Sequence, residues 1–143
     1  MARRRQRRHL RPAAIPTAVV LDSTALSAGA QGHVRVRAEL AIAEQLGTGV
    51  HVSAVTLAEV LRGHRRDARV HGLLAGVEQD LLTPELGRAA GELLGRSGRD
   101  DTIDAVVAVT AHGLGHRVRL LTGDPRDLRA LTADMAGVIV VPI

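Results

Sequence analysis

The sequence contains no cysteine and no Phe, Tyr or Trp, and it also lacks lysine and asparagine. Without cysteine the protein forms no disulfide and no thiolate metal site. Without those three aromatic residues it cannot hold single-stranded nucleic acid by stacking bases on aromatic rings, which is a common mode of binding. Any contact with nucleic acid must therefore rest on phosphate pairing, on arginine planes and on bound metal.

Long hydrophobic runs are also missing. No apolar segment reaches the ~18–20 residues that a membrane-spanning helix needs. An N-terminal secretion signal is disfavoured, because Pro16 interrupts the first apolar run and Asp22 falls where that run should continue. At 143 residues and 45% hydrophobic composition, the chain fits one domain with a substantial core. We expect a cytoplasmic protein without membrane contact.

All 19 basic residues are arginine, and they are unevenly distributed. Residues 1–11 contain six of them and no acid, whereas the rest of the chain contains 15 acids and a slight excess of negative charge. This contrast predicts a basic disordered arm over residues 1–14 and a folded domain over residues 15–143. The arm could add non-specific affinity for RNA, or it could be a tail without that role.

Short apolar runs alternate with helical patterns along the domain. Strands are predicted over residues 17–21, 50–54, 81–83, 118–121 and 138–141, and helices over 23–29, 35–46, 56–61, 65–74, 84–94, 102–114 and 125–131. No hairpin signal separates the runs. The alternation predicts an α/β fold with a parallel sheet between two layers of helices, in which the functional crevice lies beyond the carboxyl ends of the strands.

Four acids lie near the ends of predicted strands or near the starts of predicted helices: Asp22, Glu59, Asp104 and Asp124. Each one alone has a simpler explanation, because Asp22 could cap a helix, Glu59 and Asp104 could favour a first turn, and Asp124 could begin a turn. Together they are expected at one edge of the sheet. Hard carboxylate oxygens suit Mg²⁺ or Mn²⁺, so the pattern predicts metal-dependent chemistry on a phosphodiester.

These residues match the motifs of a known family. From about residue 17 to residue 143 the chain resembles PIN-domain proteins, and in particular the VapC-type ribonuclease toxins of bacterial toxin–antitoxin pairs. The matching motifs are Leu21-Asp22-Ser23-Thr24, Leu57-Ala58-Glu59-Val60, Ile103-Asp104-Ala105, and Thr122-Gly123-Asp124 followed by Asp127-Leu128. Each motif is weak by itself, and the four in order make the resemblance. The family often has an aromatic residue where this chain has Leu128.

The resemblance implies a three-layer α/β/α fold with a four- or five-stranded parallel sheet. It implies that Asp22, Glu59, Asp104 and Asp124 hold Mg²⁺ or Mn²⁺ and carry out RNA cleavage. It also implies a cognate antitoxin, so that the protein would be the toxin of a type II pair, and we expect a homodimer. Four further residues could support the ligands: Asp101, Asp127, Thr24 and Thr122. Asp101 could equally be a helix cap, and Thr122 could be a structural hydroxyl.

A group of arginines follows the second motif. Arg62, Arg65, Arg66 and Arg69 would form one stripe if a helix ran through Gly63, at positions i, i+3, i+4 and i+7. Such a stripe could contact RNA phosphates or an acidic segment of the antitoxin, or it could be a solvated helix face.

Two other functions compete with the ribonuclease. An acid-cluster phosphoesterase would use similar metal chemistry on another substrate, but a phosphatase with a covalent aspartyl intermediate would need Asp-x-Asp after the first strand, where this chain has Thr24. A degenerate PIN-like RNA-binding module would need no complete acid set, whereas all four acids are present. A short antitoxin gene next to this one would favour the toxin hypothesis over the other two.

Overall fold

The computed structural model describes residues 15–143, and the predicted basic arm of residues 1–14 lies outside the described residues. Residues 15–143 form an α/β fold in which the strands are β1 (Ala18–Leu21), β2 (Gly49–Ser53), β3 (Glu78–Asp80), β4 (Val118–Thr122) and β5 (Val138–Pro142). The helices are α1 (Ser23–Ala30), α2 (Val34–Leu46), α3 (Ala54–Val60), α4 (Ala68–Leu74), α5 (Pro84–Ser97), α6 (Thr102–Gly113) and α7 (Pro125–Leu131), with a 3₁₀ turn over Arg65–Asp67.

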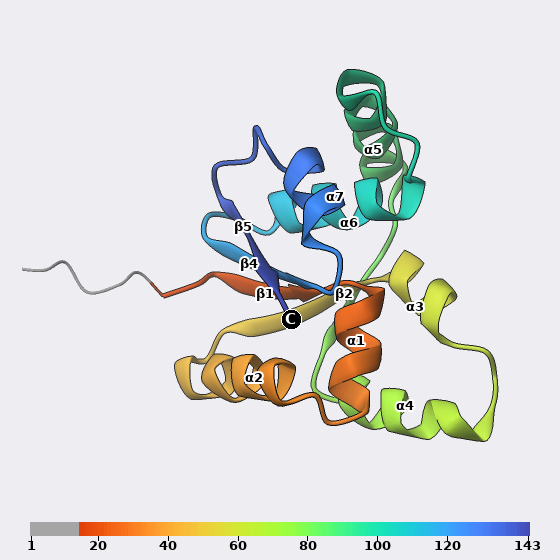
Figure 1. Cartoon of the computed structure of the whole chain (residues 1–143), viewed down its shortest axis with the longest axis vertical. Coiled ribbons are helices and arrows are strands. Elements are labelled where there is room, and N and C mark those ends of the chain that lie inside the picture. Colours follow the sequence, from red (N-terminus) through yellow and green to blue (C-terminus); the bar gives the residue numbers. More distant parts are fainter. Residues whose placement is uncertain (1–14) are drawn as a thin grey trace, which may run out of the picture.

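The five strands form one parallel sheet in the order β3-β2-β1-β4-β5. Helices cover both faces, so the predicted three-layer architecture is confirmed (Figure 1). Helices α1, α2 and α4 lie on one side of the sheet, and α6 and α7 lie on the other, with α5 packed against α6. None of the helices within residues 15–143 is long and apolar enough to cross a membrane.

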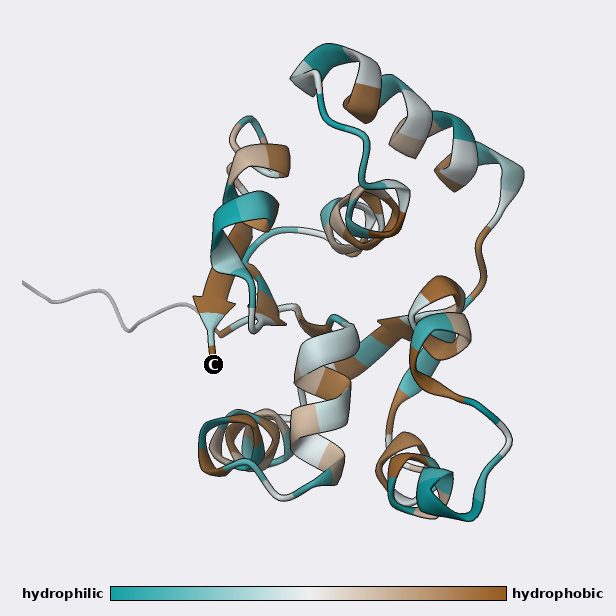
Figure 2. Ribbon diagram, turned by 45° about the vertical axis from the view of Figure 1, so that its right-hand side comes forward, coloured by the Kyte–Doolittle hydropathy of each residue, from teal (hydrophilic) through white to brown (hydrophobic). Residues whose placement is uncertain are grey.

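The two-residue period of strand β1 divides the core into two clusters. Ala18 and Val20 pack with apolar residues of α5, α6 and α7, whereas Val19 and Leu21 pack with those of α1, α2 and α4. All four residues are almost fully buried, as expected for the central strand of a parallel sheet. Figure 2 shows the apolar strands crossing the middle of the molecule, with hydrophilic residues on the outer parts of the helices.

Two predicted boundaries are wrong for identifiable reasons. The strand expected at residues 81–83 is instead Glu78–Asp80, a polar edge strand without an apolar signal, and Leu81 lies beyond it as an exposed residue. The helix expected to begin at residue 56 begins at Ala54, because Ser53 is its N-cap and accepts a hydrogen bond from the backbone of Val55.

The arginine stripe is also not formed. Helix α3 ends at Val60, Leu61 is extended, and Gly63 has a φ of +74°, in the left-handed region that favours glycine. A loop and the 3₁₀ turn therefore separate Arg62 from Arg65 and Arg66, and the four arginines do not share one continuous helix face.

Candidate functional site

The strand order reverses direction between β1 and β4. The chain builds β1, β2 and β3 toward one edge, and then crosses back through α6 to place β4 on the other side of β1. In open α/β sheets such a switch point, at the carboxyl ends of the strands, is where ligands bind. Asp22 follows β1 directly, and Thr122, Gly123 and Asp124 stand at the end of β4, so two of the predicted motifs meet at the switch point.

Asp22 is buried at the start of α1, with 5% of its surface exposed. Its Oδ1 atom accepts hydrogen bonds from the backbone N–H of Ala25 at 2.8 Å and from the Thr24 hydroxyl at 2.7 Å, so the helix-cap role considered from the sequence is real. Burial nevertheless raises the pKa of this carboxyl, and the charge of Glu59 raises it further, against the lowering effect of the hydroxyl of Thr122 and these two donors.

Thr24 links the loop after β1 to the loop after β4. Its hydroxyl donates to Asp22 and accepts a hydrogen bond from the backbone N–H of Gly123 at 2.7 Å. A Cβ atom on Gly123 would lie 3.0 Å from the Thr24 Oγ1, so only glycine allows this approach without a shift of its neighbour. The fully buried Thr122 in turn accepts from the backbone N–H of Asp124 at 2.9 Å. Both hydroxyls thus lie beside Asp22, and their role in supporting metal ligands stays a prediction.

Asp104 lies in the first turn of α6. Its backbone N–H donates to the carboxylate of Asp101 at 2.9 Å, which makes Asp101 the N-cap of that helix. Partial burial, followed by the negative charges of Asp101, Asp22, Asp127 and Glu59, raises the pKa of Asp104 to about 6. This carboxyl therefore exchanges a proton close to neutral pH.

Glu59 stands in the last turn of α3 and not in a first turn, because the helix begins earlier than predicted. The helix dipole therefore disfavours its charge there. Its carboxylate contributes to the raised pKa of both Asp22 and Asp104, so the structure brings the N-cap of α1 and residues of α3 and α6 close enough for their charges to interact.

Asp124 and Asp127 are placed differently from those three acids. Asp124 is exposed, and its charge is not among those that raise the pKa of Asp22 or Asp104. Asp127 pairs with Arg99 at 2.8 Å, so its charge is partly balanced. The structure therefore couples three of the four predicted ligands and leaves Asp124 at the same strand end, with its side chain in solvent.

The donor set fits a hard divalent cation by its chemistry. Within residues 15–143 no ion pair involves Asp22, Glu59, Asp104 or Asp124, so these carboxylates have no cationic side chain to balance them there. Their oxygens and the nearby threonine hydroxyls are suitable ligands or supports for Mg²⁺ or Mn²⁺. In the same part of the chain, however, no three His, Asp or Glu side chains are grouped closely enough to hold an ion as they stand. The metal site therefore stays a prediction.

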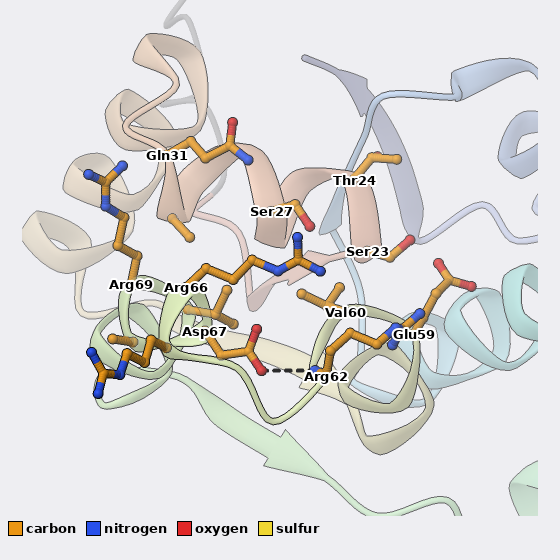
Figure 3. Close-up of a pocket in the computed structure, with 14 residues that line it drawn as sticks. Ser23, Thr24, Ser27, Gln31, Glu59, Val60, Arg62, Arg66, Asp67 and Arg69 are labelled. Carbon is orange, nitrogen blue, oxygen red and sulfur yellow. Dashed lines mark hydrogen bonds between the residues drawn. The ribbon is translucent and has the colours of Figure 1, made fainter.

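An open groove of about 970 Å³ begins at this edge and runs between α1 and the α3–α4 segment. Ser23, Thr24 and Glu59 are among the residues that line it, together with the four arginines Arg62, Arg65, Arg66 and Arg69. Figure 3 shows Arg66 extending into the space in front of Ser27 of α1. The predicted arginines thus line the same groove as Glu59, although they lie on a loop, a 3₁₀ turn and the start of α4.

Sequence reasoning missed the residue that organises this loop. Asp67 is 5% exposed, and its Oδ2 accepts hydrogen bonds from three successive backbone N–H groups, those of Arg62 and Gly63 at 2.8 Å and of His64 at 3.2 Å. These bonds, that of Arg62 first, hold the pKa of Asp67 below its usual value. The only sequence signal was an acid four residues after a glycine, which is too common to identify such a role.

The PIN domain family matches residues 19–133, a range that includes Asp22, Glu59, Asp104 and Asp124. This chain belongs to the PIN domain family. A search of curated protein sequences gave no significant match.

Solved structures similar to this PIN domain come from toxin–antitoxin systems. A chain of VapBC2 from Rickettsia felis, bound to a DNA fragment from its promoter, has a TM-score of 0.67 at 14% identity and covers 88% of this chain and 98% of its own. A toxin–antitoxin complex from Klebsiella pneumoniae gives 0.67 at 20% identity, over 88% and 100%. VapBC-5 from Mycobacterium tuberculosis gives 0.54 at 21% identity, over 90% and 100%. At these identities the likeness establishes the fold.

Proposed function

We propose that this PIN-domain protein is a metal-dependent endoribonuclease of the VapC type and acts as the toxin of a type II toxin–antitoxin pair. The observation that carries the proposal is the group of Asp22, Glu59 and Asp104 near the sheet's switch point, where burial and the charge of Glu59 raise the pKa of both aspartates and no acid of the group has a cationic partner in residues 15–143. Such repulsion is destabilising unless a cation offsets it. Membership of the PIN family supports nuclease chemistry at the level of the family.

Asp22, Glu59, Asp104 and Asp124 are the residues that would hold Mg²⁺ or Mn²⁺. Such an ion supplies a bound water of lowered pKa and neutralises charge that develops on the phosphate. The protein contributes orientation, because Thr24 and the Ala25 N–H fix the Asp22 carboxylate from one side. Asp101 fixes the first turn of α6 and with it Asp104, which exchanges a proton near pH 6.

An antitoxin partner belongs to the same proposal. Its support is that the similar structures are toxin–antitoxin assemblies by their own description. We also propose a homodimer, as expected from the sequence. Size-exclusion chromatography with light scattering measures the mass of the purified protein in solution, and a mass equal to one chain would contradict the homodimer.

One observation favours a second candidate, a PIN-like module that binds RNA without cutting it. Within residues 15–143 no three His, Asp or Glu side chains lie close enough together to bind a metal ion, and Asp124 is exposed to solvent. If the acids do not close around an ion when RNA is bound, the arginines of the groove would still bind RNA.

The deciding experiment is RNA cleavage by the purified chain with Mg²⁺, with Mn²⁺ and with a chelator. We expect cleavage only with metal, and we expect Asp22→Asn to reduce it at least about a hundredfold, because a ligand charge is lost while asparagine still caps α1. Asp134→Asn, an exposed acid beyond α7, is the matched control. Undiminished cleavage by Asp22→Asn would refute the mechanism, and binding without any cleavage by the wild type would favour the second candidate.

A further inference from the structure

The groove next to Glu59 is lined by arginines whose backbone is held by hydrogen bonds to Asp67. Arg62, Arg65 and Arg66 are exposed and lie within five residues of one another, yet the acid among them does not neutralise them. Asp67 is turned toward the backbone and accepts three N–H groups with one oxygen. Within residues 15–143 none of the four groove arginines pairs with an acid, so their positive charge is available to a ligand.

The backbone that carries these arginines is held in place by that carboxylate. The N–H groups of Arg62, Gly63 and His64 converge on Asp67, which requires the left-handed conformation of Gly63 at φ +74°. The Arg62 guanidinium also donates to the carbonyl oxygens of Ala58 and Leu61, at the end of α3. The end of α3 and the start of α4 are thereby joined into one ordered turn, seen with the Arg62–Asp67 bond in Figure 3.

The position of the groove favours a polyanion that also reaches the acids. Ser23, Thr24 and Glu59 line the same cavity as the arginines, so a phosphate chain that lies along the arginines arrives at the carboxylate edge. Arginine is the side chain best suited to bind phosphate, with a planar fork that donates two parallel hydrogen bonds. Because the chain has no Phe, Tyr or Trp, backbone contacts of this type must supply most of its affinity for RNA.

We propose that this groove holds the phosphate backbone of single-stranded RNA next to the bond that is cut, with Arg62, Arg65 and Arg66 as the phosphate contacts and Asp67 as the residue that positions them. The inference rests on the proposed function for its substrate, but it assigns a binding surface and a positioning residue outside the four acids. The low pKa of Asp67 keeps its carboxylate charged, and so keeps the turn ordered, at neutral pH.

The first test is RNA binding without cleavage, measured by fluorescence anisotropy of a short labelled single-stranded RNA in the presence of a chelator. The double variant Arg65→Ala/Arg66→Ala should bind roughly tenfold more weakly. The negative slope of log K against log salt should become shallower by about 1.4, because each lost phosphate contact of a single strand removes about 0.7. The control is Arg88→Ala/Arg129→Ala, which removes the same charge from exposed positions on α5 and α7. Equal affinities and slopes for the two double variants would overturn the inference.

An acidic protein segment is the other polyanion that this groove could take. The same variants are therefore titrated with poly-glutamate. If Arg65→Ala/Arg66→Ala lowers poly-glutamate binding while RNA binding stays at the level of the control, the surface belongs to a protein partner and the inference fails. Loss of RNA binding beyond the control supports it.

The second test concerns Asp67. Asp67→Asn keeps the size of the side chain but removes the charge that collects the three N–H groups. We expect a higher KM for RNA cleavage, roughly fivefold or more, with kcat nearly unchanged, because the acids at the sheet edge are untouched. A variant that only lost stability would show a lower Tm with the KM of the Asp134→Asn control, and that result would contradict the positioning role.

The outcomes separate this inference from the proposed function. A wild-type protein that binds RNA through the arginines but never cuts it refutes only the nuclease. A protein that cuts RNA in an Asp22-dependent way, with arginine variants equal to their controls, refutes only the groove.

Discussion

Two aspartates in this molecule have the same exposed fraction but pKa values that are shifted in opposite directions. Asp22 and Asp67 are both 5% exposed. Asp67 receives three backbone N–H groups, that of Arg62 first, and has a lowered pKa, whereas Asp22 has a raised pKa because burial outweighs one N–H and nearby hydroxyls, with the charge of Glu59 adding to the effect. Burial alone therefore does not define the role of a carboxylate. Desolvation in the core dominates at Asp22, whereas at Asp67, which lies among exposed loop residues, the N–H donors dominate.

The largest expected difference between Asp22 and Asp67 is in how much a metal ion stabilises the folded protein. If Mg²⁺ or Mn²⁺ binds only the folded protein, a concentration a hundredfold above Kd raises the free energy of unfolding by about 2.7 kcal/mol. We expect this increment, seen as a higher Tm, in the wild type and in Asp67→Asn, and we expect it to vanish in Asp22→Asn. A Tm that is independent of both metals would show that the acids do not form a cation site.

The second effect is a difference in sign between two identical substitutions. At neutral pH and without metal, Asp67→Asn should lower the free energy of unfolding, because the charged acceptor of three N–H groups is lost. Asp22→Asn should leave it unchanged or raise it, because asparagine still caps α1 and the repulsion with Glu59 disappears. Urea denaturation of both variants measures the two free energies of unfolding, and a loss of stability in both would contradict the different roles assigned to the two aspartates.

A smaller effect is the pH dependence that comes from Asp104. Its pKa of about 6 lies above the 3.8 of an ordinary aspartate, so between these values the folded state keeps a proton that the unfolded state has lost. Stability should therefore fall as pH rises from about 4 to 6. Asp104→Asn should remove this slope and gain about 1 kcal/mol at pH 7, after allowance for solvent screening of a half-buried group.

The denaturation curves of Asp104→Asn are compared with those of Asp134→Asn across that pH range. A slope that persists in Asp104→Asn would assign the pH dependence to another group, with Asp22 the first candidate because its pKa is also raised.

The smallest effect concerns a buried polar group with no donor or acceptor at all. Within residues 15–143, the Thr56 hydroxyl is fully buried and makes no hydrogen bond. Thr56→Val keeps the branched shape and removes the unsatisfied oxygen, so we expect a change of about 0.5 kcal/mol or less, in the stabilising direction. A clear loss of stability in a urea titration would show that the hydroxyl has a partner in solution, such as a buried water.

The sequence predicts the parts of this fold that depend on apolar pattern. Strands β1, β2, β4 and β5 are found within one residue of their predicted ends, because each contains Val, Leu or Ile side chains that the core requires. Strand β3 was misplaced because its residues Glu78–Asp80 carry no such pattern, and pairing with β2 alone makes them a strand.

The candidate site was predicted unevenly for a similar reason. The position after a buried strand predicted Asp22, and the position at a helix start predicted Asp104. The solvent-exposed side chain of Asp124 could not be foreseen, because it depends on how the turn into α7 is formed. Nor could the role of Asp67, since it arises from three N–H groups that converge only when Gly63 adopts its left-handed conformation.

The bond between Gly123 and Thr24 joins residues that are 99 positions apart, and β1 pairs with β4 through residues such as Ala18 and Val118, which are 100 positions apart. Contacts so distant in sequence are slow to form, because the entropy cost of closing the long loop between them precedes the gain from the contact. During synthesis, β1 leaves the ribosome long before its neighbour β4 exists. The switch point therefore cannot be assembled before β4 has been synthesised, and any activity that depends on it begins only after that.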